Sequence, residues 1–169
     1  YWAKSEIRAG RPWTPWVTIT KTGADVTVDF ELRSGETLVD DRAIYDNYGG
    51  VSTVENFGFE AEGGIASISF LGSRVNITLN SPTAAWLRHS MQIQNVSTYS
   101  HTVDPGSATP DRWMSAHRAG LRPSETRAST LFPGETLYRD LPSFAVNFDG
   151  NSVKRLDGSD FHTPVEEPT

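Results

Sequence analysis

A regular alternation of apolar and polar side chains constrains this chain more than any other feature of its sequence. From position 24 to position 32, apolar residues take every second place, and the places between them hold Asp25, Thr27, Asp29 and Glu31. Successive side chains of a β-strand point to opposite faces, so the pattern predicts a strand with one buried and one solvated face. Val17 and Ile19 alternate with threonines just upstream, and Gly23 separates the two segments. We therefore predict an antiparallel hairpin here.

The same pattern predicts a second hairpin further along the chain. Its two strands would have apolar faces made by Ala66, Ile68 and Phe70 and by Val75, Ile77 and Leu79. Gly72-Ser73 lies between them and suits a two-residue turn whose first residue has a positive φ. Further strands are predicted at Val54–Ala61, Leu87–Val96, Ser124–Leu131, Glu135–Leu141 and Ser143–Phe148.

Many short strands separated by Gly and Pro turns are typical of a sandwich or a barrel, and solvated strand faces favour antiparallel pairing. We predict an all-β fold, an antiparallel two-sheet β-sandwich of jelly-roll or immunoglobulin-like type, with one or two short helices in its loops. Asp111 and Gly120 suit the two ends of a helix over Arg112–Ala119. Ser81-Pro82 has the pattern of a helix start, which predicts one or two helical turns over Thr83–Arg88.

The 169 residues are enough for a single domain with a hydrophobic core. We predict that the sandwich domain spans residues 16–162. Residues 1–15 are aromatic, contain prolines and have little periodicity, so they are predicted to form an N-terminal arm that needs a partner. Residues 163–169 carry two prolines and two glutamates and are predicted to form a C-terminal tail.

Composition and charge exclude several classes of protein. The chain has no cysteine, which removes disulfide frameworks, Cys-ligated metal centres and thiol catalysis. Its net charge of −6 gives no broad electrostatic support for nucleic-acid binding, so no nucleic-acid partner is expected. The sequence has no apolar run near the length that crosses a bilayer, so no membrane span is expected. Locally basic stretches at Arg8 and Arg11 and around Arg112–Arg127 suit an anionic partner or a neighbouring subunit.

Motifs with a catalytic mechanism are missing from the sequence. The four histidines have no local metal-binding spacing, and no G-x-S-x-G elbow occurs. His89 has the same strand parity as Leu87, which predicts a buried, hydrogen-bonded side chain. Glu60 and Glu62 are two residues apart, as paired carboxylates could be, but their place beside Gly63-Gly64 favours the solvated end of a strand. An enzyme site gathered from His89, His101 or His117 and distant carboxylates is kept as a further alternative.

Oxygen-rich turns leave calcium open as a ligand, whereas no other cofactor is expected. Hard cations take carboxylate, amide and carbonyl oxygens from loops. The weak metal candidates are Asp149, Asn151, Asp157 and Asp160, in the turns Asp149-Gly150-Asn151 and Asp157-Gly158-Ser159-Asp160. Turns need Asp, Asn and Gly in any case, so a purely structural role is the stronger interpretation.

Loop aromatics are the remaining functional signal. Trp2, Trp13 and Trp16 cluster near the amino end, and Tyr45 and Tyr48 flank Asp46-Asn47. Such residues plug the open end of a sandwich, serve as hot spots for another chain, or stack on sugar rings. These five side chains are the predicted partner- or sugar-binding residues.

These observations together favour a non-catalytic structural or assembly protein, a subunit of a capsid, fibre or filament that acts through protein–protein contacts. Self-association or another structural protein is the expected partner, and an extracellular or particle-surface location is expected. Glycosylation sequons at Asn76 and Asn95 suit that location. The alternative is a carbohydrate-binding module that uses exposed aromatics to bind a glycan.

Overall fold

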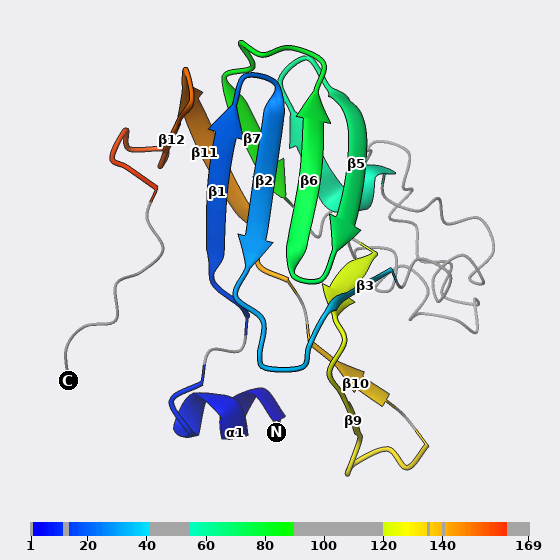
Figure 1. The fold of residues 1–169 in the computed structure, drawn as a ribbon. Coiled ribbons are helices and arrows are strands. Elements are labelled where there is room, and N and C mark those ends of the chain that lie inside the picture. Colours follow the sequence, from blue (N-terminus) through cyan, green and yellow to red (C-terminus); the bar gives the residue numbers. More distant parts are fainter. Residues whose placement is uncertain are drawn as a thin grey trace, which may run out of the picture.

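The computed structural model describes residues 2–11, 14–40, 55–89, 120–134, 136–139 and 141–161. Within these ranges the protein is mostly β, with antiparallel sheets of which none is closed (Figure 1). The predicted helix over Arg112–Ala119 and the predicted tail from residue 163 lie outside the described residues. No helix in the described part is long and apolar enough to cross a membrane.

The first sheet has four strands in the order β1-β2-β6-β5. These are β1 (Val17–Thr22), β2 (Asp25–Phe30), β5 (Ile65–Leu71) and β6 (Arg74–Leu79). Both predicted hairpins are confirmed, with Ile19 opposite Val28 and Ile68 opposite Ile77. Gly72 has a φ of 62°, the left-handed conformation that its turn was expected to need.

The second sheet also has four strands, in the order β12-β11-β7-β4. These are β4 (Phe59–Ala61), β7 (Trp86–His89), β11 (Phe144–Asp149) and β12 (Ser152–Lys154). The predicted helical turns over Thr83–Arg88 are wrong, because Trp86 onward is a strand. Leu87 pairs with Val146 of β11, and both side chains are fully buried. Burial between two neighbouring strands outweighs the local signal of Ser81-Pro82.

Shorter elements surround the two large sheets. A 3-10 segment, η1 (Glu55–Gly58), precedes β4, so the strand predicted from Val54 begins only at Phe59. Strands β3 (Leu38–Asp40) and β8 (Leu121–Pro123) pair with each other. Strands β9 (Thr126–Ala128) and β10 (Thr136–Tyr138) form a separate two-stranded ribbon. The segment predicted as an irregular N-terminal arm contains a helix, α1 (Trp2–Arg8).

One hydrophobic core is shared by the two four-stranded sheets. Its buried members follow the predicted parity in β1, β2 and β6, with Val28 and Val75 fully excluded from solvent. From the second sheet, Phe59, Leu87 and Val146 complete the core. Burying a Val, Leu or Phe side chain is worth about 1.5–3 kcal/mol, so this shared core is the main source of stability.

His89 lies inside this core, as its strand parity predicts. Its side chain is 1% exposed and is surrounded by the rings of Phe30, Phe59 and Phe144. Nδ1 lies 2.8 Å from the carbonyl oxygen of Pro142, and Nε2 lies 3.1 Å from that of Phe57. Burial lowers the pKa of His89, and the hydrogen bonds to the two carbonyl groups oppose this effect.

Candidate functional site

Helix α1 is held against the rest of the chain by a buried carboxylate. The side chain of Glu6 has no exposed surface, and Trp2 beside it is only 6% exposed. Trp2 Nε1 donates a hydrogen bond to Glu6 Oε1 at 3.2 Å. Arg11 Nε and Arg33 Nη2 donate to Glu6 Oε2 at 2.6 and 2.7 Å. Since Arg33 follows β2, these contacts fasten the amino-terminal helix to the end of the first sheet.

The same ionic network continues into the β9–β10 ribbon. Arg127 of β9 lies 3.3 Å from Glu6 Oε1, and its guanidinium lies 4.8 Å from the centre of the Trp2 ring. Arg33 Nη1 donates to Glu125 Oε2 at 2.6 Å. Arg139 is 1% exposed and donates to Glu36 Oε1 at 2.8 Å. Helix, loop and ribbon are therefore one connected unit, and residues 2–11 fold back on their own chain.

Replacing Glu6 by Gln should remove part of the acid sensitivity of this protein. The pKa of Glu6 is lowered from 4.5 to about 2, mainly by the hydrogen bond from Arg11. Burial of the carboxyl group raises the pKa, and the positive charges of Arg33, Arg11 and Arg127 lower it further. A depressed carboxyl pKa stabilises the fold above about pH 4.5, and that stability is lost as the pH falls toward about 2. Glu6→Gln should cost on the order of 2 kcal/mol at pH 7, as lost hydrogen bonds to charged groups do. Urea unfolding at pH 7 and pH 3 should show a smaller difference for this variant than for the unchanged chain; an equal difference would contradict the assignment.

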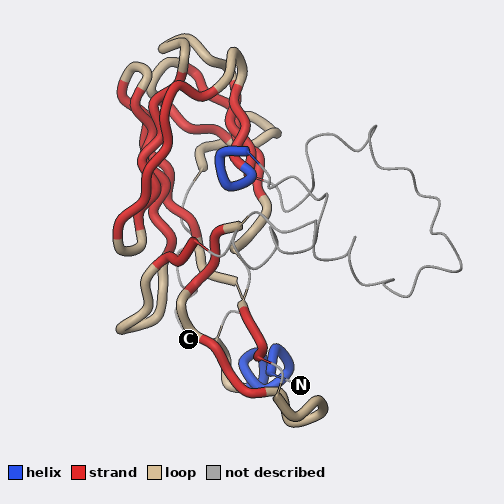
Figure 2. Tube along the Cα trace, turned by 90° about the vertical axis from the view of Figure 1, so that its right-hand side faces the viewer, coloured by secondary structure: helices blue, strands red, loops and turns tan. Residues whose placement is uncertain are grey.

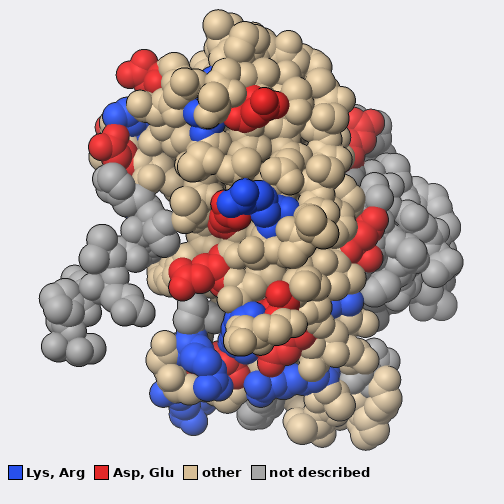
Figure 3. Space-filling model, viewed as in Figure 1, with Lys and Arg blue, Asp and Glu red and all other residues tan. Residues whose placement is uncertain are grey.

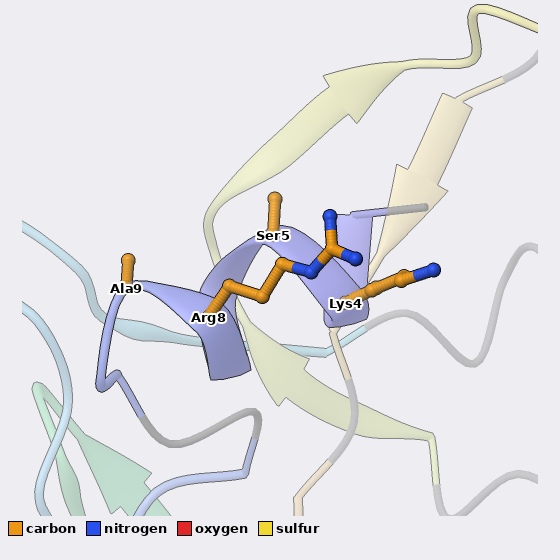
Figure 4. Close-up of a pocket in the computed structure, with 4 residues that line it drawn as sticks. All are labelled: Lys4, Ser5, Arg8 and Ala9. Carbon is orange, nitrogen blue, oxygen red and sulfur yellow. The ribbon is translucent and has the colours of Figure 1, made fainter.

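The outer surface of α1 is basic. Lys4 and Arg8 are exposed and line a shallow, open depression of about 610 Å³ together with Ser5 and Ala9. Figure 4 shows Lys4 and Arg8 extending toward the same side of the helix. In Figure 3 the Lys and Arg surface gathers at the end of the molecule that holds α1. Positive side chains are thus concentrated at one end of a chain whose net charge is −6.

Large apolar side chains are exposed at this same end. The loop between β9 and β10 presents Leu131, which is 59% exposed, and Phe132, which is 66% exposed. Ile7 of α1 is also 66% exposed. Figures 1 and 2 show α1 and the ribbon lying together beyond the end of the sheets. We call this end of the molecule, where α1 exposes Lys4, Ile7 and Arg8 and the ribbon exposes Leu131 and Phe132, the basic–apolar end.

The predicted aromatic site residues are not brought together among the described residues. Trp2 is buried against Glu6 and Arg127, which is a structural position. Trp16 is 46% exposed, and its carbonyl oxygen accepts a hydrogen bond from the backbone of Glu31 at 2.9 Å. Trp13, Tyr45 and Tyr48 lie outside the described residues. A sugar-binding row made by these side chains stays a prediction.

The predicted calcium candidates all have local partners or exposed positions in their turns. Asn151 Oδ1 accepts a hydrogen bond from Gly23 N at 2.9 Å, and Asp157 Oδ1 accepts one from Ser159 N at 2.9 Å. Asp160 forms an ion pair with Lys154, and Asp149 is exposed. No group of three or more His, Cys, Asp or Glu suited to a metal occurs in the described part of the chain. His101 and His117, the other members of the enzyme alternative, lie outside it.

Sequence reasoning missed the most conspicuous residues of this region. Leu131-Phe132 stands directly before Pro133-Gly134, and an apolar pair beside a turn is a usable signal for an exposed loop tip. The links from Glu6 to Arg33 and Arg127 join residues far apart in the chain and have no local signature. Comparison of the chain with protein-family models, with curated proteins and with solved structures finds no match.

Proposed function

We propose that this chain is a non-catalytic structural or assembly protein, which acts outside the cell or on a particle surface. It would associate with further copies of itself through the basic–apolar end. The two four-stranded sheets, which share one core, would form an antiparallel β-sandwich that carries this end. The observation that carries the proposal is that α1 and the β9–β10 ribbon lie at one end of the molecule and expose Ile7, Leu131 and Phe132 as well as Lys4 and Arg8.

Exposed apolar side chains at a loop tip favour a protein partner. Single exposed hydrophobic residues are ordinary, but a group of them rimmed by charged residues is typical of interaction sites. Removing apolar surface from water is worth about 25 cal/mol per Å², so covering Leu131 and Phe132 would supply a real driving force. Aromatic and basic side chains are also enriched where partner chains meet.

Charge complementarity favours a second copy of this chain as the partner. The opposite end of the sheets carries the exposed carboxylates Asp25, Glu62 and Asp149, at the turns where β2 begins, β4 ends and β11 ends (Figure 1). The basic side chains at one end of a copy and these carboxylates at the opposite end of the next copy would attract each other. Such head-to-tail contacts build rings or filaments, because each copy uses two different surfaces.

An outward-facing sequon supports the proposed location. Asn76 lies in the middle of β6 and its side chain is exposed. It faces solvent between Thr27 of β2 and Ser69 of β5, whereas the neighbouring Val75 and Ile77 are buried. A glycan could therefore attach there without entering the core, as a glycosylated protein outside the cell requires.

Leu131→Ser should weaken self-association and leave the fold intact. Leu156→Ser is a matched control, because Leu156 is 69% exposed and belongs to the segment after β12, away from α1 and the ribbon (Figure 1). Sedimentation velocity at several concentrations should show at least a tenfold weaker association constant for Leu131→Ser, and little change for Leu156→Ser. Equal association by both variants and the unchanged chain would reject this surface as the interface.

A further inference from the structure

A hollow of about 300 Å³ lies where the outer face of β7 meets the edge strand β4. Its lining combines the apolar side chain of Ile65 and the indole of Trp86 with polar side chains. These come from η1, β4, β5 and β7. The residues that matter here are Glu55, Asn56, Glu60, Ile65, Trp86 and Arg88. This volume is at the lower end of the range for small-molecule pockets, so it suits a single ring better than a long ligand.

Trp86 and Arg88 are held in fixed relation on the outer face of β7. The alternate side chains of the strand, Leu87 and His89, are buried in the core. Their burial fixes the strand so that Trp86 and Arg88 stay on its outer face. The Arg88 guanidinium lies 5.2 Å from the centre of the Trp86 ring and forms an ion pair with Glu60, its direct neighbour on β4. Arg88 nevertheless keeps 54% of its side chain exposed. Donors and acceptors are thereby positioned before any ligand arrives.

The hollow is also lined by the η1 turn, whose backbone has an unfavourable conformation. Asn56 has φ 49° and ψ 36°, and Phe57 has φ 52° and ψ 31°, both in the left-handed region although neither is glycine. The turn is fixed from below, since the Phe57 ring is buried and packs edge-on against Phe70 at 5.4 Å. Two consecutive strained residues that line or adjoin a hollow are typical of binding sites, where strain positions a group. Here the strained residue that lines the hollow is Asn56.

The charges around the hollow select the class of ligand. Glu55 and Glu60 oppose an anion, and Arg88, which is paired with Glu60, weakens the attraction of the hollow for a cation. A neutral molecule with many hydroxyl groups satisfies all of them, because hydroxyls both donate to carboxylates and accept from guanidinium. Trp86 and Ile65 supply apolar surface for the C–H groups of such a molecule.

We propose that this hollow binds one neutral sugar ring. Arg88 and Asn56 would donate hydrogen bonds to ring hydroxyls, Glu60 would accept them, and Trp86 would cover apolar C–H groups. The site is separate from the basic–apolar end, so sugar binding does not depend on self-association. A monomer that binds sugar would contradict only the proposed assembly, and an oligomer that binds none would contradict only this site.

A glycan array probed with the full chain tests the site. The unchanged chain should bind at least one neutral glycan, and Trp86→Ala and Glu60→Gln should each lower that signal at least tenfold. Asn56→Gly should raise the midpoint of thermal unfolding by relieving the left-handed strain, and should still weaken binding because the amide is lost. Leu156→Ala is the control, because it removes a large exposed apolar side chain that lies outside the hollow, and it should bind normally.

Two results would overturn the site. One is an array on which the unchanged chain binds no neutral glycan. The other is equal binding by Trp86→Ala, Glu60→Gln and the unchanged chain. Trp86 is half-buried, so Trp86→Ala is compared only after a thermal unfolding transition has shown that it is folded. If Trp86→Ala does not fold, Glu60→Gln tests the site, because it alters only a polar group of the hollow.

Discussion

Arg139→Met is expected to lower the free energy of unfolding by about 3–5 kcal/mol, the usual cost of removing one partner of a buried ion pair. Arg139 is 1% exposed, and its partner Glu36 keeps only 6% of its side chain exposed. The variant would leave the Glu36 carboxylate largely buried without its guanidinium donor. Urea unfolding monitored by fluorescence measures the effect, with an unchanged slope showing that two-state unfolding persists.

Two further variants separate the buried pair from ordinary surface charges. Arg74→Met removes a guanidinium that is 55% exposed and pairs with the partly exposed Asp29, and it should cost about 1 kcal/mol or less. Replacing both Arg139 and Glu36 by apolar residues should recover much of the loss, because no uncompensated charge is left buried. If Arg139→Met were no more costly than Arg74→Met, the buried network would not be the link that holds the ribbon.

His89→Ala is expected to cost at least about 3 kcal/mol, similar to other large-to-small changes in a packed core. The variant removes a ring packed among Phe30, Phe59 and Phe144 and leaves the carbonyl groups of Phe57 and Pro142 without this partner. Urea unfolding at pH 7 measures the loss. A cost below 1 kcal/mol would mean that the core does not depend on this ring.

The pH dependence gives His89 a second signature. Burial lowers its pKa below the ordinary value of 6.5, so the folded chain binds fewer protons than the unfolded chain in this range. The resulting stability is present above about pH 6.5 and decreases as the pH falls below that value. His89→Phe keeps a ring in the core but cannot titrate, so its unfolding free energy should change less between pH 7 and pH 5.5.

The alternation of apolar and polar residues predicted the strands whose faces it determines. Alternation located β1, β2, β5 and β6, and parity placed His89 inside. The helix α1 was missed because its stability comes from Arg33 and Arg127, which are distant in the sequence. The strand predicted from Leu87 matches β7 from that residue onward, but the helical turns predicted over Thr83–Arg88 were wrong, because pairing with β11 overrides a local capping signal. In both cases the deciding contacts are long-range.

The candidate sites also depend on contacts between residues that are far apart in the sequence. The basic residues of the first segment were noted in the sequence, but only the fold brings the β9–β10 ribbon to the same end of the molecule as α1. The sequence placed Glu60 at the solvated end of a strand, and its ion pair with Arg88 depends on the pairing of β4 with β7. Trp86 had no signal of its own, because its role depends on which side chains stand next to it across the sheet.

The mass of the full chain in solution tests the central claim, self-association through the basic–apolar end, most directly. Light scattering over a wide concentration range, in low and in high salt, measures that mass. We expect the mass to rise above the 18.6 kDa of one chain as concentration increases, and to rise less in high salt because the two ends attract through charge. A mass of one chain at every concentration and salt level would contradict the claim.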